Sequence, residues 1–457
     1  MKLSTLKCVF LLGVMCSVLL QIPHTFAAKA PDGPNFVPLG VYLSWELTEF
    51  WAKEANIDRW EDVQKRLDIL ANKNVNTLWV TNMIQEDIPK LLNECEKRNM
   101  KLIIRPTKMD VRWEWPTEDP NHYYRTLIPN LIALAGSSPT LTGWVLSDEP
   151  LEKDMPKVEK IRELFQEYDP NRFTLTVTMY EQTPLVPKLT NVNVVCTDIY
   201  PFFGPNDRNG PHTDDSSKTY YRAGINRMIN AIGNKKMKPW VMPQCFTEIW
   251  GPFTCDPNGD VIALPGSYYH WRMPTCAEIR WQVWEAIRGQ AKGIVFFQAA
   301  PIISCSEETA KRPPFECSWK EILLKESVNT GPGALLTRTA KTTIQMDELG
   351  EIYGRLLPLT KIIYNWKPTK ELIAESKHPA QIQNFSDSES GRFYSVIVND
   401  NLQSKEETTV RLEPQTKQVI DVISGKSLSL TEEFAGGIKT VSFPLKAGDG
   451  TIIQIIR

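Results

Sequence analysis

Hydrophobic positions between residues 36 and 300 follow two alternating spacings. Short apolar runs such as 75–80 are typical of buried strands, whereas 59–73 carries Val63, Leu67 and Leu70 at spacings of three and four, on one helical face. Strands are predicted at 36–45, 75–80, 101–105, 141–147, 173–179, 192–199, 239–245 and 293–297. Helices are predicted at 59–73, 87–98, 123–135, from Asp154 onwards, and at 184–189, 220–232 and 276–291.

Eight strands that alternate with helices predict an α/β fold, and within that class a (β/α)8 TIM barrel. A doubly wound open sheet is the alternative. The first strand is not followed by a Gly-x-Gly-x-x-Gly turn, and the phosphate-binding pattern Gly-x-x-x-x-Gly-Lys-Ser/Thr does not occur. The sequence therefore favours the barrel.

The pattern changes after the barrel. A helix is predicted at 344–366, and from residue 368 short strands alternate with turn signals such as Ser424-Gly425. These strands are predicted at 393–398, 408–412, 418–422, 439–443 and 451–456. We therefore divide the chain into a signal peptide (1–27), a (β/α)8 barrel with a flanking helix (28–366) and a C-terminal all-β sandwich (367–457).

The first residues have the pattern of a secretory signal peptide. Lys2 and Lys7 precede an apolar run at 8–20, and small residues suitable for cleavage follow it. The run is shorter than the roughly 20 residues that span a bilayer, and a retained anchor is the alternative. We therefore expect a secreted or periplasmic protein without a membrane span after cleavage.

Cysteine usage fits export, because oxidising compartments permit disulfides. Of the nine cysteines, two fall in the signal peptide and seven in the remainder, so at least one thiol stays unpaired, and Cys245 is a candidate. Cys255 with Cys276, and Cys305 with Cys317, could each close a loop, although sequence does not determine the connectivity. With five histidines and no zinc-binding spacing, neither an organic cofactor nor a catalytic metal is expected.

Net charge and aromatic content indicate which class of binding partner the sequence favours. A formal net charge of -2 argues against nucleic acid or an anionic membrane as the main partner. The 14 Trp, 13 Tyr and 17 Phe are more informative, because many of the Trp fall near predicted strand ends and loops.

The fourth strand ends abruptly in Ser147-Asp148-Glu149-Pro150. Pro150 cannot donate to a sheet, so Asp148 and Glu149 are expected at the carboxyl end of the strand, where parallel barrels place their chemistry. A desolvated glutamate there would have a raised pKa, as a general acid needs. The alternative is a solvated loop with a helix cap.

Other strand ends would project side chains into the same rim. The residues expected there are Trp45, Glu46, Asn82, Arg105, Asp110, Asp148, Glu149, Tyr180, Glu181, Asp198, Tyr200, Gln244, Glu248 and Gln298, with Trp113, Trp115, Trp250 and Trp271 in adjacent loops. Several carboxylates together with several indoles are typical of a sugar site, because two carboxyls can flank a glycosidic bond and aromatic rings can stack on sugars. Alternatively, the indoles cover the barrel and the acids cap helices.

The stretch 143–150 resembles the strand-four motif of the large clan of (β/α)8 glycoside hydrolases, with Asp148 where asparagine is more usual. Asp198-Ile199-Tyr200-Pro201 is similar to a strand-six segment of β-galactosidase-like relatives, and 274–280 with 289–294 looks like their last helix and strand. The trailing sandwich matches a common accessory domain of such enzymes. The resemblance covers most of 36–300 as a pattern.

The resemblance implies that Glu149 is the acid/base, oriented and tuned by Asp148. The family's nucleophile position on strand seven holds Gln244, and Glu248, four residues later, is our predicted nucleophile. That pair would give a retaining mechanism, with carboxyls about 5–5.5 Å apart. Otherwise another acid would act as a base across a wider gap and give inversion; these acids are Asp198, Asp110, Glu181 and Glu46.

We therefore predict a glycoside hydrolase that acts on a β-linked poly- or oligosaccharide. The predicted substrate contacts are Trp45, Glu46, Arg105, Asp110, Trp113, Trp115, Tyr180, Asp198, Tyr200, Gln244, Trp250 and Gln298. One alternative is a non-catalytic carbohydrate-binding barrel that has lost the strand-seven nucleophile. The other is a structural barrel of the cell envelope, with its rim plugged by 255–272.

Overall fold

The computed structural model describes residues 34–208, 210–250, 253–255, 261–303, 330–371, 374–376, 380–432 and 437–457. The predicted signal peptide and the candidate pair Cys305–Cys317 lie outside these residues, as does the side chain of Cys255. In the described part of the chain, no helix combines the length and the apolar character that crossing a membrane requires.

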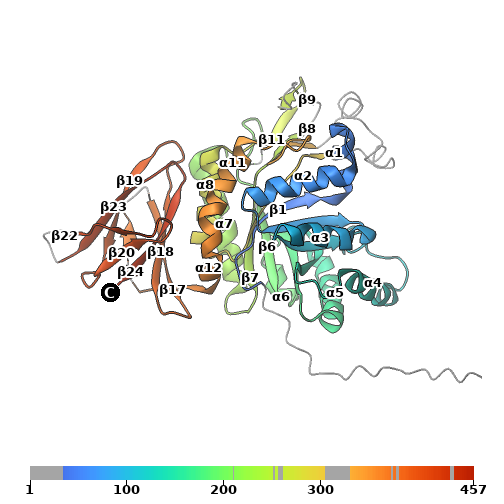
Figure 1. Ribbon diagram of the computed structural model, residues 1–457, viewed down its shortest axis with the longest axis horizontal. Helices are drawn as coiled ribbons and strands as arrows, with labels where there is room; N and C mark the ends of the chain where they lie inside the picture. The colour runs from blue at the N-terminus through green and yellow to red at the C-terminus, as the bar shows by residue number, and fades with distance from the viewer. Residues whose placement is uncertain are drawn as a thin grey trace, which may run out of the picture.

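Eight parallel strands close into a barrel in the order β1-β12-β7-β6-β5-β4-β3-β2 (Figure 1). The strands are β1 (Leu39–Ser44), β2 (Thr77–Met83), β3 (Lys101–Pro106), β4 (Leu141–Asp148), β5 (Phe173–Met179), β6 (Val194–Ile199), β7 (Lys238–Pro243) and β12 (Ile294–Phe296). Each corresponds to one predicted strand, and the closed order confirms the predicted (β/α)8 barrel.

Helices surround the barrel. They are α1 (Thr48–Ala55), α2 (Arg59–Asn72), α3 (Ile88–Lys97), α4 (Pro120–Ala135), α5 (Met155–Tyr168), α6 (Leu185–Leu189), α7 (Asp214–Ile232) and α8 (Cys276–Arg288). Helix α7 begins six residues before its predicted start, because Thr213 caps it by accepting a hydrogen bond from the Ser216 amide. Helix α1 has no counterpart among the predicted helices.

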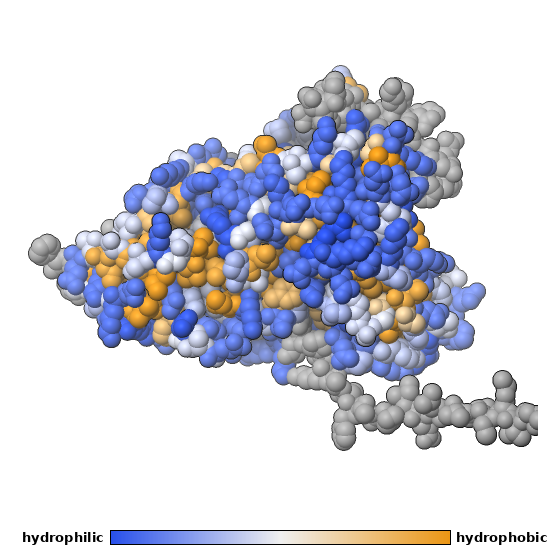
Figure 2. All heavy atoms as spheres, viewed as in Figure 1, coloured by the Kyte–Doolittle hydropathy of each residue, from blue (hydrophilic) through white to orange (hydrophobic). Residues whose placement is uncertain are grey.

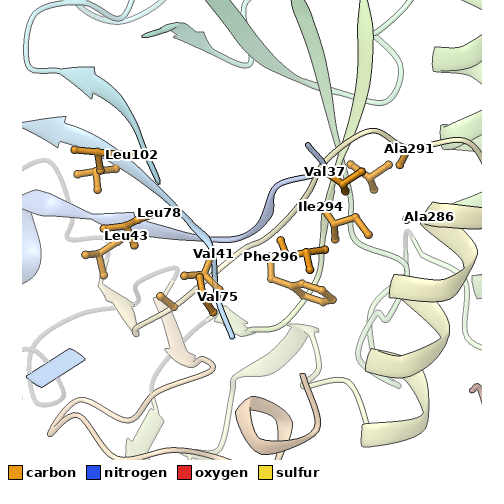
Figure 3. Close-up of a cluster of buried hydrophobic side chains, with 14 of the residues drawn as sticks. Val37, Val41, Leu43, Val75, Leu78, Leu102, Ala286, Ala291, Ile294 and Phe296 are labelled. Carbon is orange, nitrogen blue, oxygen red and sulfur yellow. The ribbon is translucent and has the colours of Figure 1, made fainter. Parts of the chain in front are cut away.

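Two apolar layers explain why the strands alternate. Val41 and Leu43 of β1 lie in the layer between the barrel and its helices, and Tyr42 lies in a separate cluster inside the barrel. Figure 3 shows part of the outer layer, with Val41, Leu78 and Ile294 from three neighbouring strands. Side chains of the inner parity therefore fill the barrel, and those nearest the carboxyl ends reach its mouth.

A small antiparallel sheet lies beyond the carboxyl end of β7. It consists of β11 (Tyr268–Trp271), β8 (Thr247–Trp250), β14 (Thr330–Gly333) and β13 (Ile302–Ile303), and a separate hairpin pairs β9 (Phe253–Cys255) with β10 (Val261–Ala263). Figure 1 shows β8, β9 and β11 projecting together from one side of the barrel. The sheet determines where Glu248 lies.

Helices α11 (Ile344–Leu356) and α12 (Thr360–Asn365) lead into two antiparallel sheets with a common apolar core. One sheet contains β15 (Trp366–Pro368), β17 (Ala380–Asp387), β18 (Phe393–Asn399), β24 (Gly450–Ile456), β20 (Gln418–Asp421) and β21 (Lys426–Leu428). The other contains β16 (Ala374–Ser376), β19 (Glu406–Leu412), β23 (Lys439–Leu445) and β22 (Thr431–Glu432). The predicted all-β sandwich is thus confirmed.

The sandwich is joined to the barrel through α8. Trp281 donates its indole N–H to Asp400 at 3.0 Å, and Trp284 donates to Asp449 at 2.8 Å. Figure 2 shows hydrophilic residues over most of the barrel on the face in view and a band of hydrophobic residues over the C-terminal sheets. Both indole nitrogens are buried, so these bonds fix the angle between the two parts.

Candidate active site

Strand β4 presents Asp148 and Glu149 through two departures from regular geometry. The pairing of β4 with β5 shifts register between Val145 and Asp148, and Glu149 has a φ of 45°, in the left-handed region. The Glu149 amide is still held by the Val177 carbonyl at 2.9 Å. Bulges and left-handed residues re-aim side chains, which is why adjacent acids here can share one mouth.

Asp110 holds the end of β4 in place. Its fully buried carboxylate accepts hydrogen bonds from the Arg105 guanidinium and from the Ser147 hydroxyl at 3.0 Å. It also accepts from the backbone amides of Asp148 at 3.2 Å and Arg112 at 2.9 Å. With four donors already bound, Asp110 positions the end of β4, and its predicted contact with a sugar stays a prediction.

A second chain of polar contacts runs from Arg105 across the mouth. Arg105 donates to the Asn82 side-chain oxygen at 2.9 Å, and the Asn82 amide donates to Glu46 at 2.7 Å. Burial raises the pKa of Glu46, and the hydrogen bond from Asn82 acts in the opposite direction. Glu46 and Arg105 therefore lie at the predicted mouth, joined by Asn82.

Asp198 and Glu149 form the central pair. Asp198 is 7% exposed and shares the inward parity of Val194 and Cys196 on β6. Burial, and next the negative charge of Glu149, raise the pKa of Asp198 well above its usual range, and a hydrogen bond links the two carboxyl groups. The two carboxyl groups hold one proton between them.

Glu149 is the more open member of the pair, with its side chain 34% exposed. Burial and the Asp148 charge raise the pKa of Glu149, while the hydrogen bond from Asp198 and the charge of Arg112 lower it. Arg112 donates from Nη1 to the Glu149 carbonyl at 2.7 Å and to Oε2 at 3.2 Å. This arginine was not among the predicted site residues, because a lone arginine in a loop carries no sequence pattern.

Asp148 is the carboxylate at the centre of the mouth. Its negative charge raises the pKa values of Tyr42, Glu46, Glu149 and Asp198, which come from three different strands or their ends. Among the residues that the structure describes, none donates a hydrogen bond to the Asp148 carboxylate. It is therefore available to a ligand.

An aromatic wall borders the acids. Tyr200 packs against Phe246, Trp271 and Phe297 at ring-centroid distances of 4.9, 5.5 and 5.7 Å, and Phe297 in turn packs on Tyr42 at 4.8 Å. Burial, then the charges of Asp198, Glu149 and Asp148, raise the pKa of Tyr200 well above its usual value, so the phenol stays protonated. Tyr200 thus lies at the predicted mouth, close to the acid pair.

Two residues predicted as sugar contacts have side chains that are occupied within the protein. The Trp45 indole is fully buried and donates to Asp87 at 2.9 Å. Gln244 is also fully buried: its oxygen accepts from the Phe202 amide at 2.9 Å, and its nitrogen donates to the Phe202 and Arg272 carbonyls at 3.1 and 2.9 Å. Gln244 positions the loop after β6.

The predicted pairing of Glu248 with Glu149 stays a prediction, and the structure places Glu248 in a second sheet. Strand β7 ends at Pro243, so Glu248 belongs to β8, opposite Trp271 of β11. Burial raises the pKa of Glu248, and it accepts the Trp250 indole N–H at 2.9 Å. Its electrostatic neighbours are Trp250 and His270, whereas those of Glu149 are Asp148, Asp198 and Arg112.

The remaining predicted contacts are distributed around the barrel. Trp113 is 70% and Trp250 38% exposed, while Trp115 is half-buried against Tyr124. Tyr180 packs on Tyr220 of α7 at 4.8 Å, and Gln298 is fully buried at the end of β12. Trp113 is therefore the most open indole of the predicted site.

The described residues include candidate metal ligands and cysteine thiols. Within them, no group of three or more His, Cys, Asp or Glu side chains could hold a metal ion. Cys245 carries a free thiol, as predicted, and the thiol of Cys276 is free too. The acid cluster is thus held by hydrogen bonds and arginines.

Fold and site together define a TIM-barrel protein with a cluster of acidic side chains at the carboxyl end of its strands. No protein-family model and no curated protein matches the sequence. Among solved structures, the chain is similar to a family 2 β-galacturonidase from Eisenbergiella tayi bound to galacturonate, with 11% identity, 70% of this chain and 51% of that chain covered, and a TM-score of 0.47.

Two β-glucuronidases are also similar to the chain. For the enzyme from Faecalibacterium prausnitzii the identity is 12%, the coverage is 71% of this chain and 49% of that one, and the TM-score is 0.45. For the enzyme from Ruminococcus gnavus these values are 9%, 71%, 52% and 0.46. The chain thus spans about half the length of these structures.

Proposed function

We propose that the protein is a glycoside hydrolase that acts on a β-linked sugar, with Glu149 as general acid. The observation that carries this proposal is the hydrogen-bonded pair of Glu149 and Asp198 beside Asp148 at the open end of the barrel, where burial raises the pKa of both members. Glycosidic cleavage needs a carboxylic acid that stays protonated near neutral pH beside the leaving oxygen. Both pKa values are raised, and Glu149, the more exposed partner, delivers the shared proton.

The second carboxyl of the reaction is Asp148. Its carboxylate is free to act on the anomeric carbon or on a water molecule, whereas Glu248 is held in another sheet. A separation near 5–5.5 Å between the reacting carboxyls gives retention, and one of about 6.5–9.5 Å gives inversion. The anomer released first, followed by proton NMR, distinguishes the two.

The test is hydrolysis of a panel of p-nitrophenyl β-glycosides and oligosaccharides by the purified protein. The panel includes β-glucuronides and β-galacturonides, the sugars named for the similar structures. We expect turnover of at least one substrate, a loss of about 10²-fold or more in E149Q, and a matching loss in D148N. E248Q is the matched control and keeps activity. Inactivity of the wild type on the whole panel would refute the proposal.

A second candidate is a non-catalytic carbohydrate-binding barrel. The observation that favours it is the buried Gln244 at the end of the seventh strand, whose side chain is held by backbone groups of the protein. Calorimetry with the same oligosaccharides distinguishes the candidates: a binding protein takes them up without releasing product, and E149Q binds as the wild type does.

We also propose that the chain is exported. The support is the signal-peptide pattern at 1–27. Expression of the full-length gene, followed by N-terminal sequencing of the secreted product, tests this. A mature chain that begins near residue 28 is expected, and an uncleaved chain retained in the cell would contradict it.

A further inference from the structure

Trp113 is exposed beside the acid, and its position has a structural cause. The Arg112 guanidinium carbon lies 4.3 Å from the centroid of the Trp113 ring, while the same guanidinium donates to Glu149. One guanidinium therefore separates the indole from the proton donor. Trp113 is nevertheless 70% exposed, so the ring face away from Arg112 is open.

The loop that carries Trp113 is anchored. Asp110 accepts from the Arg112 amide at 2.9 Å, its own amide donates to Glu114 at 3.0 Å, and the Glu114 amide donates to the Asp110 carbonyl at 2.8 Å. Val111 is fully buried between them. An exposed ring on an anchored loop is preorganised, so little ordering would oppose the binding of a ligand.

The proposed role of Glu149 as general acid indicates which part of the substrate lies near Trp113. A general acid protonates the oxygen of the leaving group, so the leaving group lies on the exposed side of Glu149, where Arg112 and Trp113 are found. The negative face of an indole attracts the C–H edge of a ring. We propose that Trp113 is the platform for a ring-shaped leaving group, a sugar or an aryl ring, and sets the specificity at that position.

This inference rests on the proposed function, and a comparison of leaving groups tests it. For the glycone of the panel that is hydrolysed, kcat/KM is measured with the p-nitrophenyl β-glycoside, with the β-linked disaccharide and with the β-glycosyl fluoride. Fluoride has no ring that could stack. All three substrates share the glycone, so only contacts with the leaving group differ.

W113A is expected to lower kcat/KM by roughly tenfold for the aryl glycoside and the disaccharide, and by less than about twofold for the fluoride. W113F restores most of the lost activity, because it keeps an aromatic face. The basic limb of the pH profile, which reports the general acid, stays in place, because Arg112 still contacts Glu149. I344A removes an equally exposed side chain, 69%, at the start of α11 and leaves all three rates unchanged.

Three results would overturn the inference while the wild type remains active. Equal losses on all three substrates would show a general disturbance of the site, and no loss on any would show that Trp113 touches nothing in the reaction. A loss confined to the disaccharide would show a disturbed general acid, because p-nitrophenolate and fluoride leave with little protonation. A wild type that hydrolyses none of the substrates would instead overturn the proposed function, and this platform with it.

Discussion

Substitution of Asp110 by alanine would remove the carboxylate that organises the end of β4. Arg105 is only 5% exposed and would lose its buried anionic partner. Breaking one side of a buried ion pair costs about 3–5 kcal/mol, and each buried donor left unsatisfied costs about 1–3 kcal/mol. These terms overlap, so we expect D110A to lower the free energy of unfolding by roughly 3–5 kcal/mol.

The assay is equilibrium unfolding in urea, followed by tryptophan fluorescence, for D110A, R105M and the double variant. R105M removes the cation and keeps an apolar stem of similar length. The double variant leaves neither charge unpaired, so it should be about 0.5–3 kcal/mol more stable than the sum of the single losses predicts. D110N keeps one acceptor oxygen and should fall between the wild type and D110A.

Additive losses in this cycle would refute the reasoning, because they would show that Asp110 and Arg105 stabilise the barrel independently. A loss in D110A below about 1 kcal/mol would refute it too, since surface carboxylates behave in that way. Activity provides a second check. D110N should reduce turnover while leaving the protein folded, because Asp148 and Arg112 lose a fixed acceptor.

Three further predictions follow from buried polar groups. The folded state holds the Asp198 proton at pH values where the unfolded chain releases it, so the free energy of unfolding falls as pH rises above about 4. The melting temperature of D198N should therefore exceed that of the wild type by a margin that grows with pH. Q244E should lose about 1–3 kcal/mol in urea unfolding and gain no activity, because it removes the donor to the Phe202 carbonyl; Q244E as stable as the wild type would contradict this. Burial lowers the pKa of Lys292 to about 7, so above that pH the unfolded chain binds one proton more than the folded chain. Between pH 7 and 9 the free energy of unfolding of the wild type should therefore rise by about 2–3 kcal/mol relative to K292M. Parallel curves of stability against pH would contradict this.

The barrel could be predicted because its strands face two different apolar layers. Leu39, Val41 and Leu43 pack outward and Tyr42 packs inward, and the other strands repeat such an alternation, except β5, whose apolar residues all lie in the inner layer. The predicted start of helix α7 was wrong because polar residues occupy its first turn. The start of α7 reads Asp214-Asp215-Ser216-Ser217, which resembles a loop until the cap at Thr213 is recognised.

The sheet of β8, β11, β14 and β13 could not be predicted in the same way. Its strands pair residues as distant as Ile249 and Thr330, and no local spacing indicates such a contact. This unpredicted sheet also affected the predicted position of Glu248. Glu248 was placed only by its distance along the chain from strand seven. The sequence therefore did not predict that Glu248 lies on β8 or that it accepts a hydrogen bond from the Trp250 indole.

The site was predictable only as a set of strand ends. Asp148, Glu149 and Asp198 were expected at the rim, and the parallel order of β4, β5 and β6 brings them there. Which acids meet depends on parity and on one shift of register, neither of which the residue types reveal. Asp198 has the inward parity of Cys196, whereas Gln244 turns to the backbone of Phe202.

The resulting pair has a chemical consequence. Carboxyl groups joined by a hydrogen bond lie closer together than the about 5–5.5 Å that separates acid and nucleophile in retaining glycosidases. Asp198 therefore cannot act from the opposite side of a sugar that Glu149 protonates. Its burial instead keeps a proton at the mouth, and the left-handed backbone at Glu149 turns that acid toward Asp198 while Asp148 stays free. In the proposed reaction, proton supply and attack on the sugar are assigned to different carboxylates, so D198N should shift the basic limb of the pH profile, which reports the general acid, more than it lowers the rate at the optimum.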